Sequence, residues 1–341
     1  MLLGTLGAKS RKVYALVALA AAVCCGAVVG TRGCRNTHVR AGGGEEDFAF
    51  HISPKGDAIV FSANSSGGKD IYLFDPKTSQ VTRLTNTPAY ESGPAYSLDG
   101  KSIVYAAGKT GDRADHIHTR SLDGTKSKQL TNEDHNDSAP SFSHDGSYIV
   151  FARNLTYAWG GLAPSWGSDG AVYVMKADGT QLRRLTHDNL VPSSPQFMPD
   201  GRSIVYWASG QNSEWNVFRI ALHDGKSPRQ PKKLTSDDLS REATVSPSGQ
   251  HIAFVSDPTG QGYAGGFRLF TMNSDGTGRR QILKNALANR PAFTPDGRHI
   301  YFLGATTYDD WGLWRVDIAG KHLHQVASSR LFENPSSLVS N

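Results

Sequence analysis

Several connections between predicted strands carry carboxylate, imidazole or guanidinium groups that could bind a metal ion or a partner. These residues are His135, Asp137, His187, Asp188, Glu242 and Arg290. Oxygen and imidazole groups around one channel could hold Ca²⁺ or Mn²⁺. The set that would form such a site is His135, Asp137, His187 and Glu242. Asp and Asn also stabilise turns by bonding to the backbone, so the main prediction is a binding surface with no catalytic residue, no metal and no cofactor.

Two long connections add aromatic residues to the candidate binding surface. Residues 154–168 contain Tyr157, Trp159 and Trp166, and residues 257–266 contain Tyr263. Aromatic side chains on loops often anchor protein contacts, and they also stack on sugars. The alternative is that these rings fold the long connections back onto the body of the protein, because a long loop needs buried side chains to be ordered.

The elements that must position these residues follow a repeated pattern that occurs six times. Its tight turns contain Gly56, Gly100, Gly146, Gly201, Gly249 and Gly297. An isoleucine follows each of these glycines by three residues, and an aromatic residue comes two positions later, as in Ile59 and Phe61. A large apolar residue stands four positions before each glycine. A further apolar stretch follows, and the repeat ends in four cases on Leu-Thr, as at Leu84 and Thr85.

Each repeat predicts four short antiparallel strands. A turn glycine supplies the positive φ of a tight hairpin, and two apolar residues spaced by two positions face the same side of a strand. The glycines are 44 to 55 residues apart, which is typical of a four-stranded propeller blade. The sequence therefore predicts an all-β fold, a six-bladed β-propeller. A β-sandwich is the alternative, but it gives no reason for six similar units.

The motif Ser/Thr-Pro-Asp-Gly-x-x-Ile-x-Phe, followed by an apolar strand and Leu-Thr, resembles the PD40 (WD40-like) repeat of the TolB-like propellers. The resemblance covers residues 48–327. It implies a six-bladed propeller, and the variable aromatic connections predict a non-enzymatic scaffold that binds a protein or peptide in the cell envelope. Metal-dependent carbohydrate lyases and hydrolases carry related repeats, so an enzyme using the propeller channel is the alternative.

The amino-terminal residues differ in character from the repeats. Lys9, Arg11 and Lys12 precede an apolar or small run over residues 13–30, which predicts a signal peptide or membrane anchor at residues 1–30. Residues 31–46 are predicted to be a flexible tether. The protein is therefore expected to be exported, to the periplasm or another extracytoplasmic site. It would stay anchored to the inner membrane if the segment is not cleaved.

The charge distribution argues against a nucleic-acid partner. The net charge is +5, but residues 1–41 hold six basic and no acidic residues, so the other 300 residues are nearly neutral. All three cysteines lie before residue 35, which leaves the propeller at residues 47–341 without disulfides. The blades are predicted at about 47–86, 87–132, 133–186, 187–235, 236–284 and 285–327, with a tail over 328–341. That tail echoes the start of a first strand and could close the ring.

Overall fold

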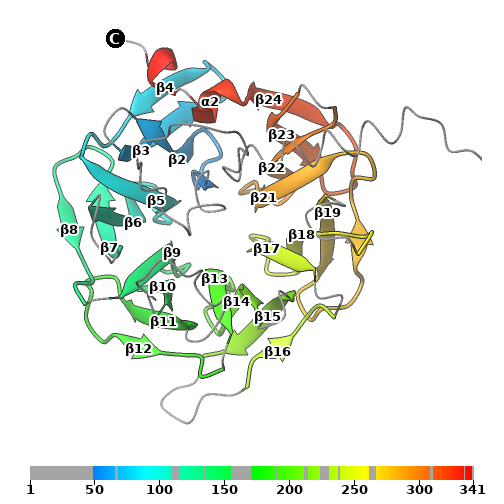
Figure 1. The fold of residues 1–341 in the computed structure, drawn as a ribbon, viewed down its shortest axis with the longest axis horizontal. Helices are drawn as coiled ribbons and strands as arrows, with labels where there is room; N and C mark the ends of the chain where they lie inside the picture. Colours follow the sequence, from blue (N-terminus) through cyan, green and yellow to red (C-terminus); the bar gives the residue numbers. More distant parts are fainter. Residues whose placement is uncertain are drawn as a thin grey trace, which may run out of the picture.

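The computed structural model shows an all-β fold in which antiparallel sheets surround a central axis (Figure 1). The structure describes residues 49–65, 68–109, 115–133, 135–154, 170–188, 190–210, 214–222, 230–236, 239–260, 266–307, 310–333 and 335–339. The predicted signal peptide or anchor and the predicted tether lie outside these ranges. No helix among the described residues has the length and apolar character needed to cross a bilayer.

The strands repeat in groups of four along the chain, from the axis outward. The innermost strands are β1 (Phe50–Ile52), β5 (Ala89–Tyr96), β9 (Asn136–Phe142), β13 (Val191–Phe197), β17 (Ser240–Val245) and β21 (Leu287–Phe293). The second strands are β2 (Ile59–Ser65), β6 (Ser102–Lys109), β10 (Tyr148–Asn154), β14 (Ser203–Ser209), β18 (His251–Ser256) and β22 (His299–Ala305). The third strands are β3 (Gly68–Asp75), β7 (His116–Ser121), β11 (Gly170–Lys176), β15 (Trp215–Ala221), β19 (Arg268–Asn273) and β23 (Gly312–Asp317). The outermost strands are β4 (Gln80–Arg83), β8 (Ser127–Gln129), β12 (Arg183–Arg184), β16 (Lys232–Lys233), β20 (Arg280–Gln281) and β24 (His324–Ser328).

Strands β9 to β24 form four separate four-stranded antiparallel sheets. Strands β1 to β8 form one larger sheet, made of two antiparallel groups, β1–β4 and β5–β8. The two groups are linked through a parallel pairing of β3 with β5 at Lys69 and Tyr90. Four antiparallel strands per repeat is the arrangement that the sequence pattern predicts.

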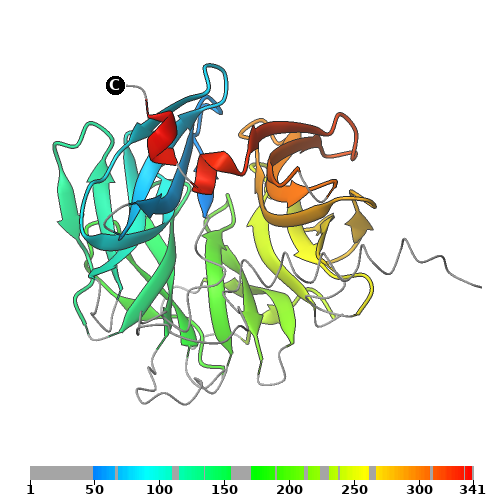
Figure 2. The ribbon, with the colours of Figure 1, turned by 45° about the horizontal axis from the view of Figure 1, so that its top comes forward.

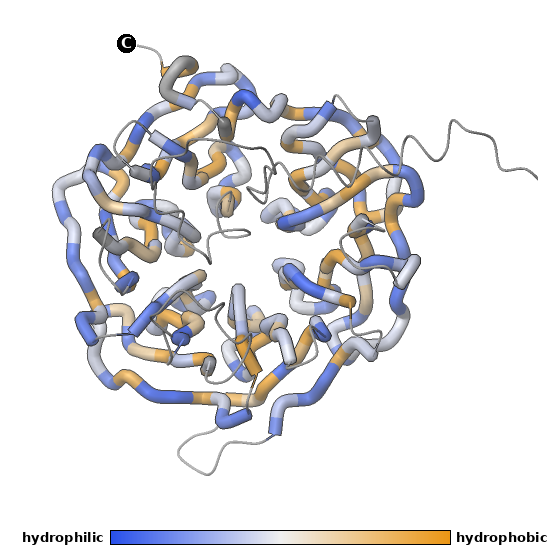
Figure 3. The backbone as a smooth tube through the Cα atoms, viewed as in Figure 1, coloured by the Kyte–Doolittle hydropathy of each residue, from blue (hydrophilic) through white to orange (hydrophobic). Residues whose placement is uncertain are grey.

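The repeated apolar residues form the core between neighbouring sheets. The isoleucine of every repeat is at most 1% exposed, and the following aromatic residue is at most 4% exposed. Each of these aromatics faces a ring on the third strand, as in the stacked pair Phe61 and Tyr72. The hydrophobic residues gather in the middle strands and the hydrophilic ones at the periphery and the turns (Figure 3). The six turn glycines all have φ between 66° and 73°, as their place in tight hairpins requires.

The Leu-Thr ending of the repeat has a structural role that explains why it recurs. The hydroxyl oxygen of Thr85 accepts a hydrogen bond of 2.8 Å from the backbone N–H of Ile71 on the third strand. Equivalent bonds from third-strand N–H groups reach Thr131, Thr186 and Thr235. The threonine therefore satisfies a buried backbone donor where the short outermost strand has ended.

The carboxyl-terminal tail joins the last sheet to the first. It forms two short helices, α2 (Arg330–Glu333) and η3 (Pro335–Leu338) (Figure 2). The sequence of this tail is similar to the start of a first strand, but the tail is helical there. Leu331 and Phe332 are 2% and 3% exposed and belong to a core that contains residues of both β2 and β23. Val339 then forms a parallel bridge with Val81 of β4. The tail thus closes the ring through apolar packing and one bridge.

Candidate binding channel and loop base

A β-bulge interrupts the innermost strand in five of the repeats. At each bulge one residue has φ between 48° and 59°, and these residues are Gly93, Ala139, Ser194, Glu242 and Arg290. The strand register shifts at each of them. Proline follows in four cases, at Pro94, Pro140, Pro195 and Pro291. Because proline cannot donate a ladder hydrogen bond, the strand must deviate there.

The bulges line an open cavity of about 100 Å³ on the axis of the ring, to which all six innermost strands contribute residues. Alanine, proline, glycine and serine make up most of the lining, together with His51, Gln196, Glu242 and Arg290. Glu242 Oε2 accepts a hydrogen bond of 2.6 Å from the backbone N–H of Arg290. Arg290 Nε lies 3.9 Å from Glu242 Oε1. The structure therefore brings two of the predicted binding residues together, as a charged pair in a lining of small side chains.

His51 is the titratable ring in this cavity, and it makes the stability of the fold sensitive to acid. Burial lowers the pKa of His51 from 6.5 to about 4, against the opposing effect of a backbone hydrogen bond at Ile52. The unfolded chain therefore binds a proton between about pH 6.5 and pH 4 that the folded chain does not, so stability falls as the pH drops through this window.

We expect the thermal midpoint to decrease from pH 7 to pH 4.5, and the decrease to be smaller in His51→Gln. Thermal denaturation followed by circular dichroism at several pH values measures this. His118, whose pKa burial also lowers to about 4, contributes in the same direction. His187→Gln, at an exposed position, should keep the full decrease. An equal decrease in all three proteins would show that His51 is not responsible.

Asp137 is buried in an ion pair and is not a free ligand. Arg153 on β10 donates from Nε to Asp137 Oδ1 at 2.6 Å and from Nη2 to Asp137 Oδ2 at 2.9 Å. Arg153 Nη1 also bonds to Glu133, whose side chain is 52% exposed. The guanidinium carbon lies 4.9 Å from the centroid of the Tyr173 ring, so the cation is held between carboxylates and aromatic faces.

This ion pair stands at the base of the long connection in the third repeat. Arg153 is followed by the last residue of β10 and then by residues 155–169, which lie outside the described residues. The predicted binding residues Tyr157, Trp159 and Trp166 fall in that segment, and Tyr263 also lies outside the described residues. The sequence could have revealed Arg153, because a large basic residue stands there where the other five repeats have Ala, Ser or Gly at the same position of the second strand.

The four residues of the alternative metal set do not form a metal site. No group of three or more His, Cys, Asp or Glu side chains in the described ranges is placed to hold a metal ion. Asp137 is bound by Arg153, and Glu242 by Arg290, while His187 is exposed. The prediction that His135, Asp137, His187 and Glu242 converge on one ion is wrong, because arginines of the chain already neutralise both carboxylates.

Two other predicted binding residues, Asp188 and His135, each have a buried polar side-chain atom that makes no hydrogen bond within the described part of the chain. Asp188 is half-buried, and burial raises the pKa of its carboxyl group. Among the described residues, Asp188 Oδ1 and His135 Nδ1 have no hydrogen-bond partner. The two belong to different repeats, and the structure does not bring them to the Glu242 and Arg290 pair.

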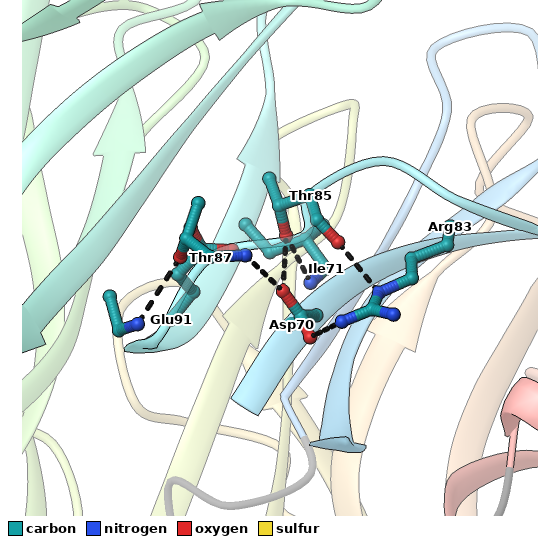
Figure 4. Close-up of polar contacts among 7 residues, drawn as sticks. Asp70, Ile71, Arg83, Thr85, Thr87 and Glu91 are labelled. Atoms are coloured by element: carbon teal, nitrogen blue, oxygen red, sulfur yellow. Dashed lines mark hydrogen bonds and ion pairs between the residues drawn. The ribbon is translucent and has the colours of Figure 1, made fainter. Parts of the chain in front are cut away.

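A polar network at the junction of the first two repeats was not predicted from the sequence (Figure 4). Arg83 Nη2 donates to Asp70 Oδ2 at 2.5 Å, and the buried Asp70 also accepts from the N–H of Thr87 at 3.2 Å. Thr87 donates in turn to Glu91 at 3.0 Å. Burial raises the pKa of Glu91. The Thr85 hydroxyl donates to Asp70, and the Thr235 hydroxyl donates to Asn216 in the same way in the fourth repeat. This repeated pairing of Asp or Asn with the threonine of Leu-Thr is the sequence pattern that could have revealed the network.

A ring of antiparallel sheets whose innermost strands line an axial cavity is the architecture of a β-propeller. The model of the PD40 family, the TolB beta propeller domain, matches residues 33–158 and 162–336, and the chain belongs to this family.

Relatives agree with this assignment. The Tol-Pal system protein TolB of Francisella tularensis subsp. mediasiatica (strain FSC147) is 29% identical over 250 residues, which cover 71% of this chain and 53% of that protein. The chain thus spans about half the length of that relative. The crystal structure of TolB from Acinetobacter baumannii superposes with a TM-score of 0.64 at 18% identity, over 80% of this chain and 63% of that one. Putative TolB from Agrobacterium tumefaciens gives 0.61 at 18% identity, over 76% and 88%. These two solved structures share the fold.

Proposed function

We propose that the chain is a six-bladed propeller that acts as a non-enzymatic scaffold and binds a protein or peptide partner in the cell envelope. The observation that carries this proposal is the axial cavity, in which one charged pair, Glu242 and Arg290, stands among small side chains. Non-glycine residues in the left-handed region cost on the order of 1 to 2 kcal/mol each. Such strained positions are often found where a protein holds a ligand. Ala139, Ser194, Glu242 and Arg290 adopt this conformation around the cavity.

The proposed position in the cell is supported by the amino-terminal sequence and by the relatives. Residues 1–30 have the basic start and apolar run of an export segment. The Francisella tularensis relative is a Tol-Pal system protein, so a component of such a system is the first partner to test. The scaffold would act in the periplasm or another extracytoplasmic compartment, held at the membrane if the segment is retained.

The proposal is tested by binding rather than by turnover. Purified protein is immobilised and exposed to envelope extract of its host, and captured proteins are quantified by mass spectrometry. We expect a specific envelope protein to be captured by the wild type and its capture to fall about tenfold with Arg290→Ala, as for a central interface residue. Alanine is accommodated there, since Ala139 has the same backbone conformation at the equivalent position.

Arg298→Ala is the matched control, because Arg298 is exposed on the turn of the same repeat. Capture that is equal with wild type and Arg290→Ala, or no capture at all, would contradict a binding role for the cavity. A rise in thermal midpoint with Ca²⁺ or Mn²⁺ would instead indicate a metal site made by other residues.

A further inference from the structure

The tight turns of neighbouring repeats contact each other through a proline and a glycine. The Cδ atom of Pro54 lies 3.6 Å from the point where a Cβ on Gly100 would stand. The Cδ atoms of three other prolines lie equally close to a Cβ placed on the next turn glycine. These distances are 3.3 Å for Pro199 and Gly249, 3.7 Å for Pro247 and Gly297, and 3.4 Å for Pro295 and Gly56. The last of these pairs links the final repeat to the first. A proline ring therefore fills the space over the next glycine at four junctions.

Two consecutive junctions depart from this pattern. The turn of the second repeat has Leu98 in the place of proline, and the turn of the third has His144. Among the described residues, no atom lies within 4 Å of a Cβ placed on Gly146 or on Gly201, the glycines that follow around the ring. Leu98 does not replace the missing proline, because its side chain is 48% exposed.

A cavity of about 490 Å³ opens at the first of these two junctions. Leu98 and Gly146 both line it, together with Phe142 and Thr119 of the adjoining strands and Ala177, which directly follows β11. His144 is not part of this lining. The cavity belongs to the turn end of the ring and is distinct from the axial cavity, with which it shares no lining residue.

Two carboxylates flank this cavity. Asp99 Oδ1 accepts a bond of 2.6 Å from the Ser97 hydroxyl, and Asp145 Oδ1 accepts one of 2.6 Å from the Ser143 hydroxyl. These hydrogen bonds lower the pKa of both groups, so both are ionised at neutral pH. The described residues that line the cavity include these two carboxylates and no lysine or arginine, so the lining is negatively charged, although Lys101 lies near Asp99.

We propose that this notch, formed by Leu98, Asp99, Asp145 and Gly146, docks a turn of a partner protein that carries a proline followed by a basic residue. The chain shows the required fit itself, since its own turn Ser53, Pro54, Lys55 and Gly56 fills the preceding junction with the Pro54 ring. A proline from the partner would take the empty place over Gly146, and its basic neighbour would meet the two carboxylates.

The probe is a head-to-tail cyclised hexapeptide that contains Ser-Pro-Lys-Gly, titrated into the ¹⁵N-labelled full chain. We expect amide shift changes at Leu98 and Gly146 with a dissociation constant on the order of 1 mM. Leu98→Pro, which restores the missing ring, should weaken binding about tenfold or more. It should fold, because the same turn carries proline in four other repeats. His144→Pro makes the same change at the next junction and should bind as the wild type does.

The charges are tested separately by the double variant Asp99→Asn and Asp145→Asn, which keeps the hydrogen-bond acceptors. It should weaken the lysine peptide about tenfold and leave a lysine-to-alanine analogue unaffected. The proposal is overturned if the wild type shows no shift changes at 10 mM peptide, a concentration about ten times the expected dissociation constant, or if Leu98→Pro and His144→Pro behave alike. It is also overturned if the free protein sediments as a dimer that Leu98→Pro abolishes, since the occupant would then be a second copy of the chain.

Discussion

Replacement of Arg153 by methionine should lower the free energy of unfolding by about 3 to 5 kcal/mol. Arg153 is 2% exposed and Asp137 is 1% exposed, so removing the cation leaves a buried carboxylate without its bidentate partner. The contacts of the guanidinium with the Phe151 and Tyr173 rings are lost as well. Denaturant titration followed by tryptophan fluorescence measures the change.

Three further variants separate the ion pair from other effects. Arg183→Met, at an exposed position, should change the free energy of unfolding by less than about 0.5 kcal/mol. Combining Arg153→Met with Asp137→Leu should recover much of the loss, because a buried ion pair can often be replaced by packed apolar groups. Glu133→Gln should have a small effect, since Glu133 is largely solvated. A loss below about 1 kcal/mol in Arg153→Met would contradict the assignment of this pair as a structural anchor.

Replacement of Phe332 by alanine should also lower the free energy of unfolding of the propeller, by about 3 to 5 kcal/mol. The Phe332 ring meets the Phe61 ring edge-on with 5.3 Å between centroids, and both side chains are at most 3% exposed. The substitution leaves a cavity at the contact that connects the carboxyl-terminal tail with β2 of the first repeat. The midpoint of thermal or denaturant unfolding reports this loss.

The tail also provides its own control. Leu338 is 41% exposed in η3, so Leu338→Ala should leave the midpoint nearly unchanged. Deletion of residues 331–341 removes Leu331, Phe332 and the bridge at Val339, and should lower the midpoint more than Phe332→Ala does. An unchanged midpoint in the deletion variant would show that the tail does not close the ring.

The repeated residues predicted the strands because their requirements are local. A glycine at positive φ, an isoleucine three residues later and an aromatic two further on define a turn and one face of a strand, whatever the rest of the chain does. The structure confirms all six turn glycines as positive-φ positions and every one of these apolar residues as core.

The candidate site was harder to predict because its contacts join residues far apart in the chain. Asp137 and Glu242 were expected in connections between strands, but they lie within the innermost strands β9 and β17. Their partners Arg153 and Arg290 lie 16 and 48 residues further on, and only the packing of strands shows that they neutralise these carboxylates. The bulges left a weaker signal, namely proline two residues before the large apolar residue in four repeats, as at Pro94 and Tyr96.

The tail shows a different limit. Its sequence echoes the start of a first strand, but an isolated strand segment needs an edge with which to pair. The apolar surface between the last and first repeats instead favours a short helix that buries Leu331 and Phe332.

The bulges and the short outer strands together limit the pairing of the sheets with strands of another molecule. A sheet edge that is open to solvent can pair with a strand of a second molecule and start aggregation. On the axis, five inner edges are interrupted by a bulge. On the outside, β12, β16 and β20 have two residues each, too few to serve as a template. Strand addition is therefore disfavoured at the five interrupted inner edges and at β12, β16 and β20, and the proposed partner would be recognised there through side chains.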